Sequence, residues 1–207
     1  MFGGLFGRKK QREWDKKKEI IVNQLVSDAR EALETIDEVL EELEREYYAT
    51  GFEADAYEEI LQEKERELEL NPSPRLENEV NRLLLDAERI NERLTYLGDL
   101  IDYFRDLRTD ILMAEDRTKI QMIINEGNLM EKLKSIKENL TKVLAYDDLE
   151  KLALLAKIIK KECQISKRRQ VHKRTVKTKL GERIERVRKL LREVQSENDE
   201  NEEVQSS

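Results

Sequence analysis

The chain of 207 residues has few of the residues that bend a polypeptide. It contains two prolines and seven glycines, whereas a β-sandwich or barrel needs turn residues about every 8–12 positions. Aromatic residues make up 5% and hydrophobic residues 38% of the chain, which is little for a thick globular core. These shortages exclude an all-β fold and favour helices that each bury one apolar stripe.

Cysteine and histidine occur once each, as Cys163 and His172. A single cysteine cannot form an intrachain disulfide, which favours a reducing compartment, so we expect a cytoplasmic protein. His172 lies among cations without a nucleophile or metal ligand nearby in sequence, and Cys163 is expected to be a semi-buried structural residue. The glycines are scattered and form no phosphate-binding loop. We therefore expect no catalytic residue, no metal, no cofactor and no enzymatic activity.

Long hydrophobic runs are also missing from the sequence. No run approaches the roughly 18 apolar residues of a transmembrane helix. At the N-terminus the apolar residues precede the cations, which is the reverse of the order in a signal peptide. Any membrane contact would then be peripheral.

Charge is abundant and unevenly distributed. Charged residues make up 41% of the chain, and the net charge is −7. Residues 157–192 contain 15 Lys and Arg against 3 Asp and Glu, a net charge of +12. The rest of the chain therefore carries about −19, which indicates an acidic body, a basic segment and a short acidic tail.

Apolar residues recur every three or four positions along most of the chain, which is typical of helices that pack side by side. The first stripe covers residues 16–47 and is expected to end at Thr50-Gly51, and a second helix is expected over 53–70. The residues that follow, 71–74, include two prolines and predict a turn.

The strongest heptad-like pattern begins after this turn. Ser73 is expected to cap a helix with Pro74 at its first position, and the helix is expected to extend to about Glu126. Gly127-Asn128 then marks a kink or stop. A shorter helix and another one capped by Asp147 or Asp148 are expected next. A last amphipathic helix would bury Leu180, Ile184, Val187, Leu191 and Val194.

The predicted fold is all-α, an elongated helical hairpin or coiled coil with shorter C-terminal helices. Its expected segments are an N-terminal amphipathic basic segment (1–15), the long hairpin (16–126), short helices (128–161), a basic segment with the terminal amphipathic helix (162–195) and a disordered acidic tail (196–207).

The first ten residues, MFGGLFGRKK, are unlike the rest of the chain. Large apolar residues alternate with glycines and are followed by cations, and in a helix the apolar ones would share one side. Such a segment can insert its apolar side chains into a membrane interface while its cations bind lipid phosphates, weakly as one copy and firmly in an assembly. The alternatives are a disordered start or packing on a neighbouring helix. The candidate membrane-contact residues are Phe2, Leu5, Phe6, Arg8, Lys9 and Lys10.

A second cationic group lies in the basic segment and has three interpretations. Its side chains could neutralise nucleic-acid phosphates, bind an anionic membrane, or fold back on the acidic body of the same or a neighbouring chain. No aromatic residue is interleaved, so stacking on bases is not expected. The candidate residues of this basic patch are Lys167, Arg168, Arg169, Lys173 and Arg174.

The start Met1–Lys10 resembles that of ESCRT-III proteins. The order of parts is similar too: a helical hairpin, a shorter segment such as Asn128–Ile136 with its following helix, and a late amphipathic helix. The resemblance implies a non-enzymatic, self-assembling protein that remodels membranes, with Phe2, Leu5 and Phe6 inserted into the lipid.

Another segment, Leu100–Leu112, is similar to the helical core of GINS replication proteins. This second resemblance implies a coiled-coil adaptor in DNA transactions that uses the basic patch on phosphates. A third interpretation is a coiled-coil scaffold that binds neither lipid nor nucleic acid. Self-association is expected under the first interpretation, and partner proteins cannot be named from the sequence.

Overall fold

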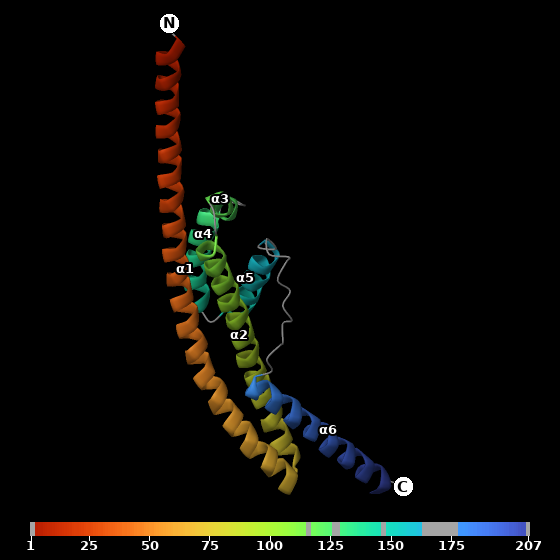
Figure 1. Ribbon diagram of the computed structural model, residues 1–207. Coiled ribbons are helices and arrows are strands. Elements are labelled where there is room, and N and C mark those ends of the chain that lie inside the picture. Colours follow the sequence, from red (N-terminus) through yellow and green to blue (C-terminus); the bar gives the residue numbers. More distant parts are fainter. Residues whose placement is uncertain (1–2, 115–116, 126–128, 146–147, 163–177, 206–207) are drawn as a thin grey trace. The chain divides into compact units, whose positions relative to one another are not determined.

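The computed structural model describes residues 3–114, 117–125, 129–145, 148–162 and 178–205. These ranges form α-helices with short connections and contain no strand, which confirms the predicted all-α fold. The helices are α1 (Gly3–Leu70), α2 (Pro74–Leu112), α3 (Arg117–Asn125), α4 (Leu129–Ala145), α5 (Leu149–Glu162) and α6 (Lys179–Gln205), as drawn in Figure 1.

The break predicted at Thr50-Gly51 is wrong, because α1 is one helix of 68 residues. Thr50 is 2% exposed and Ala54 is 6% exposed, so the buried stripe continues across Gly51. A glycine inside a helix costs about 1 kcal/mol relative to alanine, and the burial of the stripe on both sides outweighs that cost.

The turn predicted at residues 71–74 is present, and α2 begins at Pro74 as expected. The Ser73 Oγ accepts a hydrogen bond from the backbone N–H of Leu76 at 3.3 Å, and the Ser73 carbonyl accepts one from Glu77 at 2.9 Å. Ser73 therefore caps α2. Pro74 is the first residue of the helix, where a backbone N–H would have no partner within the helix, so proline is well tolerated there.

The third predicted helix is shorter than expected, since α2 ends at Leu112 rather than near Glu126. Leu112 and Met113, the side chains that follow the buried Ile111, are 55% and 74% exposed. Burial therefore no longer favours a longer helix at this point, although no proline or glycine marks the end of α2. The separate helix α3 follows and ends at Asn125; Gly127 and Asn128 lie outside the described residues.

The two shorter helices expected after residue 128 are present as α4 and α5. Helix α4 buries Leu129, Leu133, Leu140 and Val143. Asp148 is the cap of α5, because its Oδ1 accepts a hydrogen bond from the backbone N–H of Lys151 at 3.0 Å. All five residues assigned to the last amphipathic helix are buried in α6.

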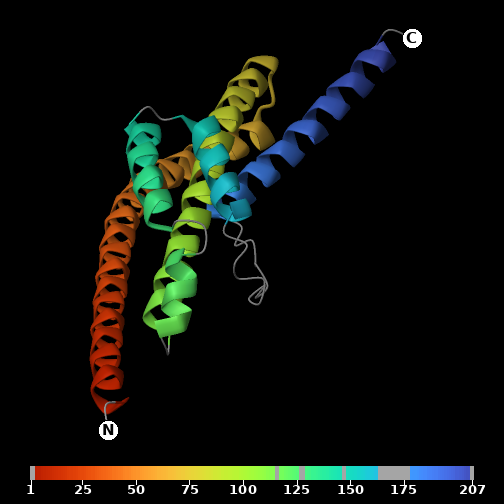
Figure 2. The same cartoon turned by 90° about the horizontal axis from the view of Figure 1, so that it is seen from above.

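The acidic tail differs from its prediction, since α6 is helical as far as Gln205 and the expected disordered segment begins at Ser196. Four of its twelve residues are glutamates, which have high helix propensity, and the tail extends a helix that has already begun. Both views in Figures 1 and 2 show this C-terminal part of α6 extending past the hairpin helices.

The chain forms two compact units, and neither is a continuous stretch of sequence. The first unit consists of residues 1–43 and 101–147, and the second of residues 44–100 and 148–207. The segments predicted from the sequence are consecutive, and these units are not. Helices α1 and α2 each contribute one part to both units.

In the first unit, α1 runs antiparallel to α2 and parallel to α4. Arg108 on α2 donates to the Asp37 carboxylate on α1 at 2.6 Å. Increasing residue numbers on α1 pair with increasing numbers on α4, since Glu31 meets Lys134 and Glu38 meets Lys137. The buried residues of this unit are Leu25, Ala32, Ile36, Val39, Leu40, Leu43, Ile101, Phe104, Ile111, Ile124, Leu129, Leu133, Leu140 and Val143.

The second unit contains the closed end of the hairpin and one long helix packed on it. Ion pairs Arg93–Glu46 at 2.5 Å and Lys64–Glu79 at 3.0 Å fix the antiparallel register of α1 and α2 here. One apolar cluster joins α1, α2 and α6. Its buried members are Ala54, Leu61, Leu68, Val80, Leu84, Ala87, Leu94, Leu180, Ile184, Val187 and Leu191.

Candidate functional site

The N-terminal membrane-contact residues lie at the very start of α1. Leu5, Phe6, Arg8, Lys9 and Lys10 belong to the helical backbone, although their side chains lie outside the description, and Phe2 lies outside the described residues altogether. The helical backbone agrees with the expectation that these apolar residues can share one side. Their contacts remain a prediction.

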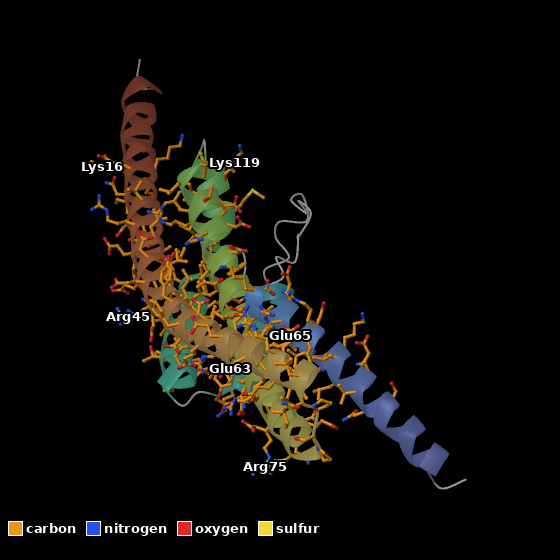
Figure 3. All side chains as sticks on the ribbon, turned by 90° about the horizontal axis from the view of Figure 1, so that it is seen from below. Lys16, Arg45, Glu63, Glu65, Arg75 and Lys119 are labelled. Carbon is orange, nitrogen blue, oxygen red and sulfur yellow. The ribbon has the colours of Figure 1, made fainter. Side chains whose placement is uncertain are left out.

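The described side chains that follow this start are exposed. Lys16, Lys17 and Lys18 are exposed, and Ile20 is 67% exposed. Leu25 is the first buried side chain among those described. Figure 1 shows the first turns of α1 extending past the other helices of this unit, and Lys16 projects from the helix in Figure 3. The residues from Gly3 to Gln24 therefore form a helical arm of roughly 33 Å without a described core of its own.

The basic patch Lys167, Arg168, Arg169, Lys173 and Arg174 lies outside the described residues, as do Cys163 and His172. The structure describes the later part of the basic segment in α6. Two arginines of α6, Arg183 and Arg188, form ion pairs with acidic residues of α1 and α2.

Arg183 on α6 is held between two glutamates of α1. Its guanidinium donates to the Glu58 carboxylate at 2.9 and 3.1 Å, and to the Glu65 carboxylate, which is labelled in Figure 3 where α1 meets α6. The side chain of Arg183 is 11% exposed, against 25% for Glu58 and 18% for Glu65. Burial alone would lower the pKa of Arg183, but the hydrogen bonds that it donates to both carboxylates, together with the attraction of their charges, outweigh burial and raise the pKa. The cation therefore stays charged in this contact.

Two further contacts hold the start and middle of α6. Arg188 forms an ion pair with Glu88 of α2, and the Thr178 hydroxyl donates to the Asn91 side-chain oxygen. The same Thr178 Oγ1 accepts a hydrogen bond from the Gly181 N–H at 2.9 Å and so caps α6. For Arg183 and Arg188, the structure shows the folding back on the acidic body that the sequence left as one of three alternatives.

The first unit has a comparable but more exposed set of charged contacts between α4 and α1. Lys134 meets Glu31 at 2.7 Å, Lys137 meets Glu38 at 2.5 Å, and the Thr141 hydroxyl donates to Glu42 at 3.3 Å. The hydrogen bond to Glu31, aided by the attraction of its charge, raises the pKa of Lys134.

Two pairs of exposed apolar side chains in the second unit were not singled out from the sequence. Tyr48 and Phe52 on α1 are 65% and 76% exposed, and Leu154 and Ile158 on α5 are 56% and 42% exposed. The sequence signal is present, since Tyr48 and Phe52 fall out of phase with the partly buried Tyr47 and the buried Thr50 and Ala54. Only the structure shows that the described helices leave Tyr48 and Phe52 exposed.

In the described part of the chain, His, Cys, Asp and Glu do not gather in any group of three or more that could hold a metal ion. None of the helices in these ranges is both long and apolar enough to cross a lipid bilayer.

Comparison with protein-family models, with curated proteins and with solved structures found no match for this chain.

Proposed function

We propose that this chain is a non-enzymatic, self-assembling helical protein that contacts anionic membranes through the start of α1. The observation that carries the proposal is the helical arm from Gly3 to Gln24, whose described side chains are all exposed. It begins with apolar residues and continues with cations at positions 8–10, 12 and 16–18. This is the composition of a helix that lies in a lipid interface.

The energetics support weak binding by one copy and firm binding by an assembly. Three large apolar side chains contribute only a few kcal/mol when they enter a membrane, at roughly 1.5–3 kcal/mol each before ordering costs. Each cation near an anionic surface adds about 1 kcal/mol. Linked copies bind more tightly because each added arm attaches at high effective concentration. Membrane remodelling is the finer proposal, and it rests on the resemblance of Met1–Lys10 to ESCRT-III proteins.

The test is co-sedimentation of the full chain with vesicles that contain phosphatidylserine and with neutral vesicles. Replacement of Phe2, Leu5 and Phe6 by serine is expected to abolish pelleting with the anionic vesicles. Replacement of Arg8, Lys9 and Lys10 by glutamine is expected to weaken it and to reduce its dependence on salt.

The matched control replaces three exposed apolar side chains elsewhere in the first unit, Leu112, Met113 and Met122, by serine. This variant should pellet like the unchanged chain. The proposal fails if the unchanged chain does not pellet with anionic vesicles, or if the N-terminal variants pellet equally well.

A parallel arm with duplex DNA tests the adaptor interpretation. Salt-sensitive binding to DNA that disappears when Lys167, Arg168, Arg169, Lys173 and Arg174 become glutamine would favour that interpretation instead. A chain that binds neither ligand would be a scaffold.

A further inference from the structure

The exposed side of α1 in the second unit carries an aromatic side chain followed by a row of charges. Phe52 is 76% exposed, on the side of the helix opposite the buried Thr50 and Ala54. Exposed charged residues follow it at steps of three, four, four and three positions, which keeps them on one side of a helix. The Phe52 stripe is defined here as Phe52, Asp55, Glu59, Glu63 and Arg66.

The charges of the Phe52 stripe are not used by the described part of the chain. Its three carboxylates and Arg66 are exposed, and none of the four forms an ion pair with another described residue. The neighbouring Glu58 and Glu65 differ, because Arg183 of α6 binds both of them. The stripe therefore presents three negative charges and one positive charge to a partner.

The arm at the start of α1 has the same spacing with the opposite signs. Leu5 is followed by charged residues at steps of three, four, four and three positions. The backbone is helical here, so these positions share one side of the arm. Lys16 and Glu19 are exposed, and Figure 3 shows Lys16 projecting from α1. The arm stripe is defined here as Leu5, Arg8, Arg12, Lys16 and Glu19.

A stagger of 47 residues makes the two stripes complementary at every charged position. The sign changes at the last position of both stripes, so the match includes a cation on the Phe52 stripe and an acid on the arm. The other acidic residues of the arm, Glu13 and Asp15, align with Ile60 and Gln62, so no two carboxylates are aligned. The aligned pairs are Leu5 with Phe52, Arg8 with Asp55, Arg12 with Glu59, Lys16 with Glu63 and Glu19 with Arg66.

We infer that the arm of one copy lies parallel to α1 of a second copy, with its arm stripe along the Phe52 stripe. A second copy is required because both stripes belong to one uninterrupted helix, which cannot fold back along itself. Opposite charges at equal spacing favour this partner over an unrelated one. The inference rests on the self-assembly in the proposed function and names the surfaces responsible.

Another part of α1 has charges at the same spacing but is already in use. Its residues are Glu34, Glu38, Glu42 and Arg45. Lys137 meets Glu38, and the Thr141 hydroxyl donates to Glu42. The position that would face Leu5 is Glu31, which meets Lys134 and offers no apolar contact. The Phe52 stripe is therefore the better partner for the arm.

The contact joins two different surfaces in a parallel, staggered arrangement, which determines the assembly it builds. Each pair of copies leaves one arm and one Phe52 stripe unused, so further copies extend the pair into a chain. Successive copies are displaced by about 70 Å, at about 1.5 Å of helix per residue. Leu5 and Arg8 are shared with the proposed membrane contact, so each copy uses them for one of the two at a time.

The experiment measures self-association of the full chain by sedimentation velocity over a range of concentrations at low salt, without membranes. The arm variant carries Arg12→Glu and Lys16→Glu, and the stripe variant carries Glu59→Lys and Glu63→Lys. Each alone is expected to raise the dissociation constant at least about tenfold, because two aligned pairs become pairs of like charge. The candidate membrane-contact residues are unchanged in both, and circular dichroism checks that both keep their helices.

Combining the reversals provides the sharper result. A chain with all four substitutions should associate like the unchanged chain, since every aligned pair again has opposite charges. A 1:1 mixture of the arm variant and the stripe variant should associate for the same reason. The matched control, Asp86→Lys with Glu92→Lys, makes the same change in net charge on exposed side chains of α2 in the same unit and should change nothing.

Cysteine cross-linking tests the stagger independently, in chains that also carry Cys163→Ser. Lys9 and Ala56 are 47 positions apart, so Lys9→Cys in one chain and Ala56→Cys in another should form a disulfide on mild oxidation. A disulfide requires the two Cα atoms to lie within about 7 Å. Ala49→Cys, two helical turns before Ala56, should not be joined to Lys9→Cys.

Several results would overturn the inference. Self-association of both charge variants at the level of the unchanged chain would exclude this contact while leaving self-assembly in place. A chain with four reversals that stays monomeric, an equal loss in the control, or equal cross-linking at Ala49 and Ala56 would also reject it. If the unchanged chain is monomeric at every concentration, with and without vesicles, the inference and the self-assembly in the proposed function both fail. Membrane binding is measured separately and can survive either result.

Discussion

The contact of α6 with the hairpin in the second unit differs from the contact of α4 with α1 in the first, although both join basic residues to an acidic helix. Arg183 is 11% exposed and precedes Ile184, a member of the apolar cluster, whereas Lys134 and Lys137 are 59% and 43% exposed. Both contacts have short distances between charged atoms. Their energetic roles are expected to differ because water screens the second set far more.

The difference indicates that the burial of a charged side chain determines its effect on folding more than the charge itself does. An exposed ion pair contributes at most about 1 kcal/mol and often nothing measurable. A buried arginine gives little net stability but makes its partners indispensable, because removal of the cation leaves carboxylates poorly solvated. Arg183 therefore specifies how α6 docks on α1, while the apolar cluster supplies most of the free energy.

The largest expected effect comes from removing Arg183. Arg183→Ala should lower the free energy of unfolding by roughly 2–3 kcal/mol, because Glu58 and Glu65 lose their partner and the apolar stem is lost. Lys137→Ala should cost less than about 0.5 kcal/mol, since its pair is exposed. Urea unfolding measures both, and amide hydrogen exchange in α6 shows whether the loss is local.

The control for this comparison combines Arg183→Met with Glu58→Gln and Glu65→Gln. It removes the charges together and should recover much of the stability lost in Arg183→Ala. Equal costs for Arg183→Ala and Lys137→Ala would contradict the contrast between the two contacts.

A smaller effect of opposite sign is expected at Gly51. A Cβ added there meets no atom within 4 Å, so Gly51→Ala should raise the free energy of unfolding by about 0.5–1 kcal/mol through helix propensity. At Gly181 a Cβ would lie 3.1 Å from the Thr178 Oγ1 and 3.3 Å from the Asn91 Oδ1, so Gly181→Ala should gain less. Thermal unfolding compares the two. A destabilised Gly51→Ala protein would argue that α1 is interrupted at Gly51 after all.

The smallest effect concerns pH and the exposed cap of α5. The hydrogen bonds that Lys151 donates from its side chain and its backbone lower the pKa of the Asp148 carboxyl below its usual 3.8. Because the folded pKa is the lower one, the cap stabilises α5 fully above the usual value and loses its effect as pH falls through the lowered value. NMR titration of the carboxyl and hydrogen exchange at the Lys151 amide measure this. Asp148→Asn, which caps without charge, should remove the pH dependence.

Much of the fold was predictable because the buried side of a helix appears in the sequence as apolar residues at every third or fourth position. The stripes of α4 and α6, the turn at residues 71–74 and the caps at Ser73 and Asp148 all follow from local spacing and capping chemistry. The failures at Gly51 and Leu112 share one cause. A helix continues or stops according to the total free energy of burial along it, and one glycine or an absent breaker is a weak guide to that sum.

The candidate surfaces were only partly predictable. The cationic groups could be identified from composition, but three interpretations remained open for the basic segment. The exposed pair Tyr48 and Phe52 was missed because the neighbours of a helix face are unknown from the sequence alone. Exposure depends on which helices come to lie beside each face.

The sequence by itself determined the helical class of this protein, its heptad-like stripes, its caps and its division into acidic and basic stretches, since these depend on residues close together in the chain. Only the tertiary structure decided that residues 44–100 join 148–207 in one unit, that Arg183 pairs with Glu58 and Glu65, and which apolar pairs stay exposed. The two contacts of Arg183 join residues 125 and 118 positions apart. They depend on which faces lose water together, and local spacing does not encode that outcome.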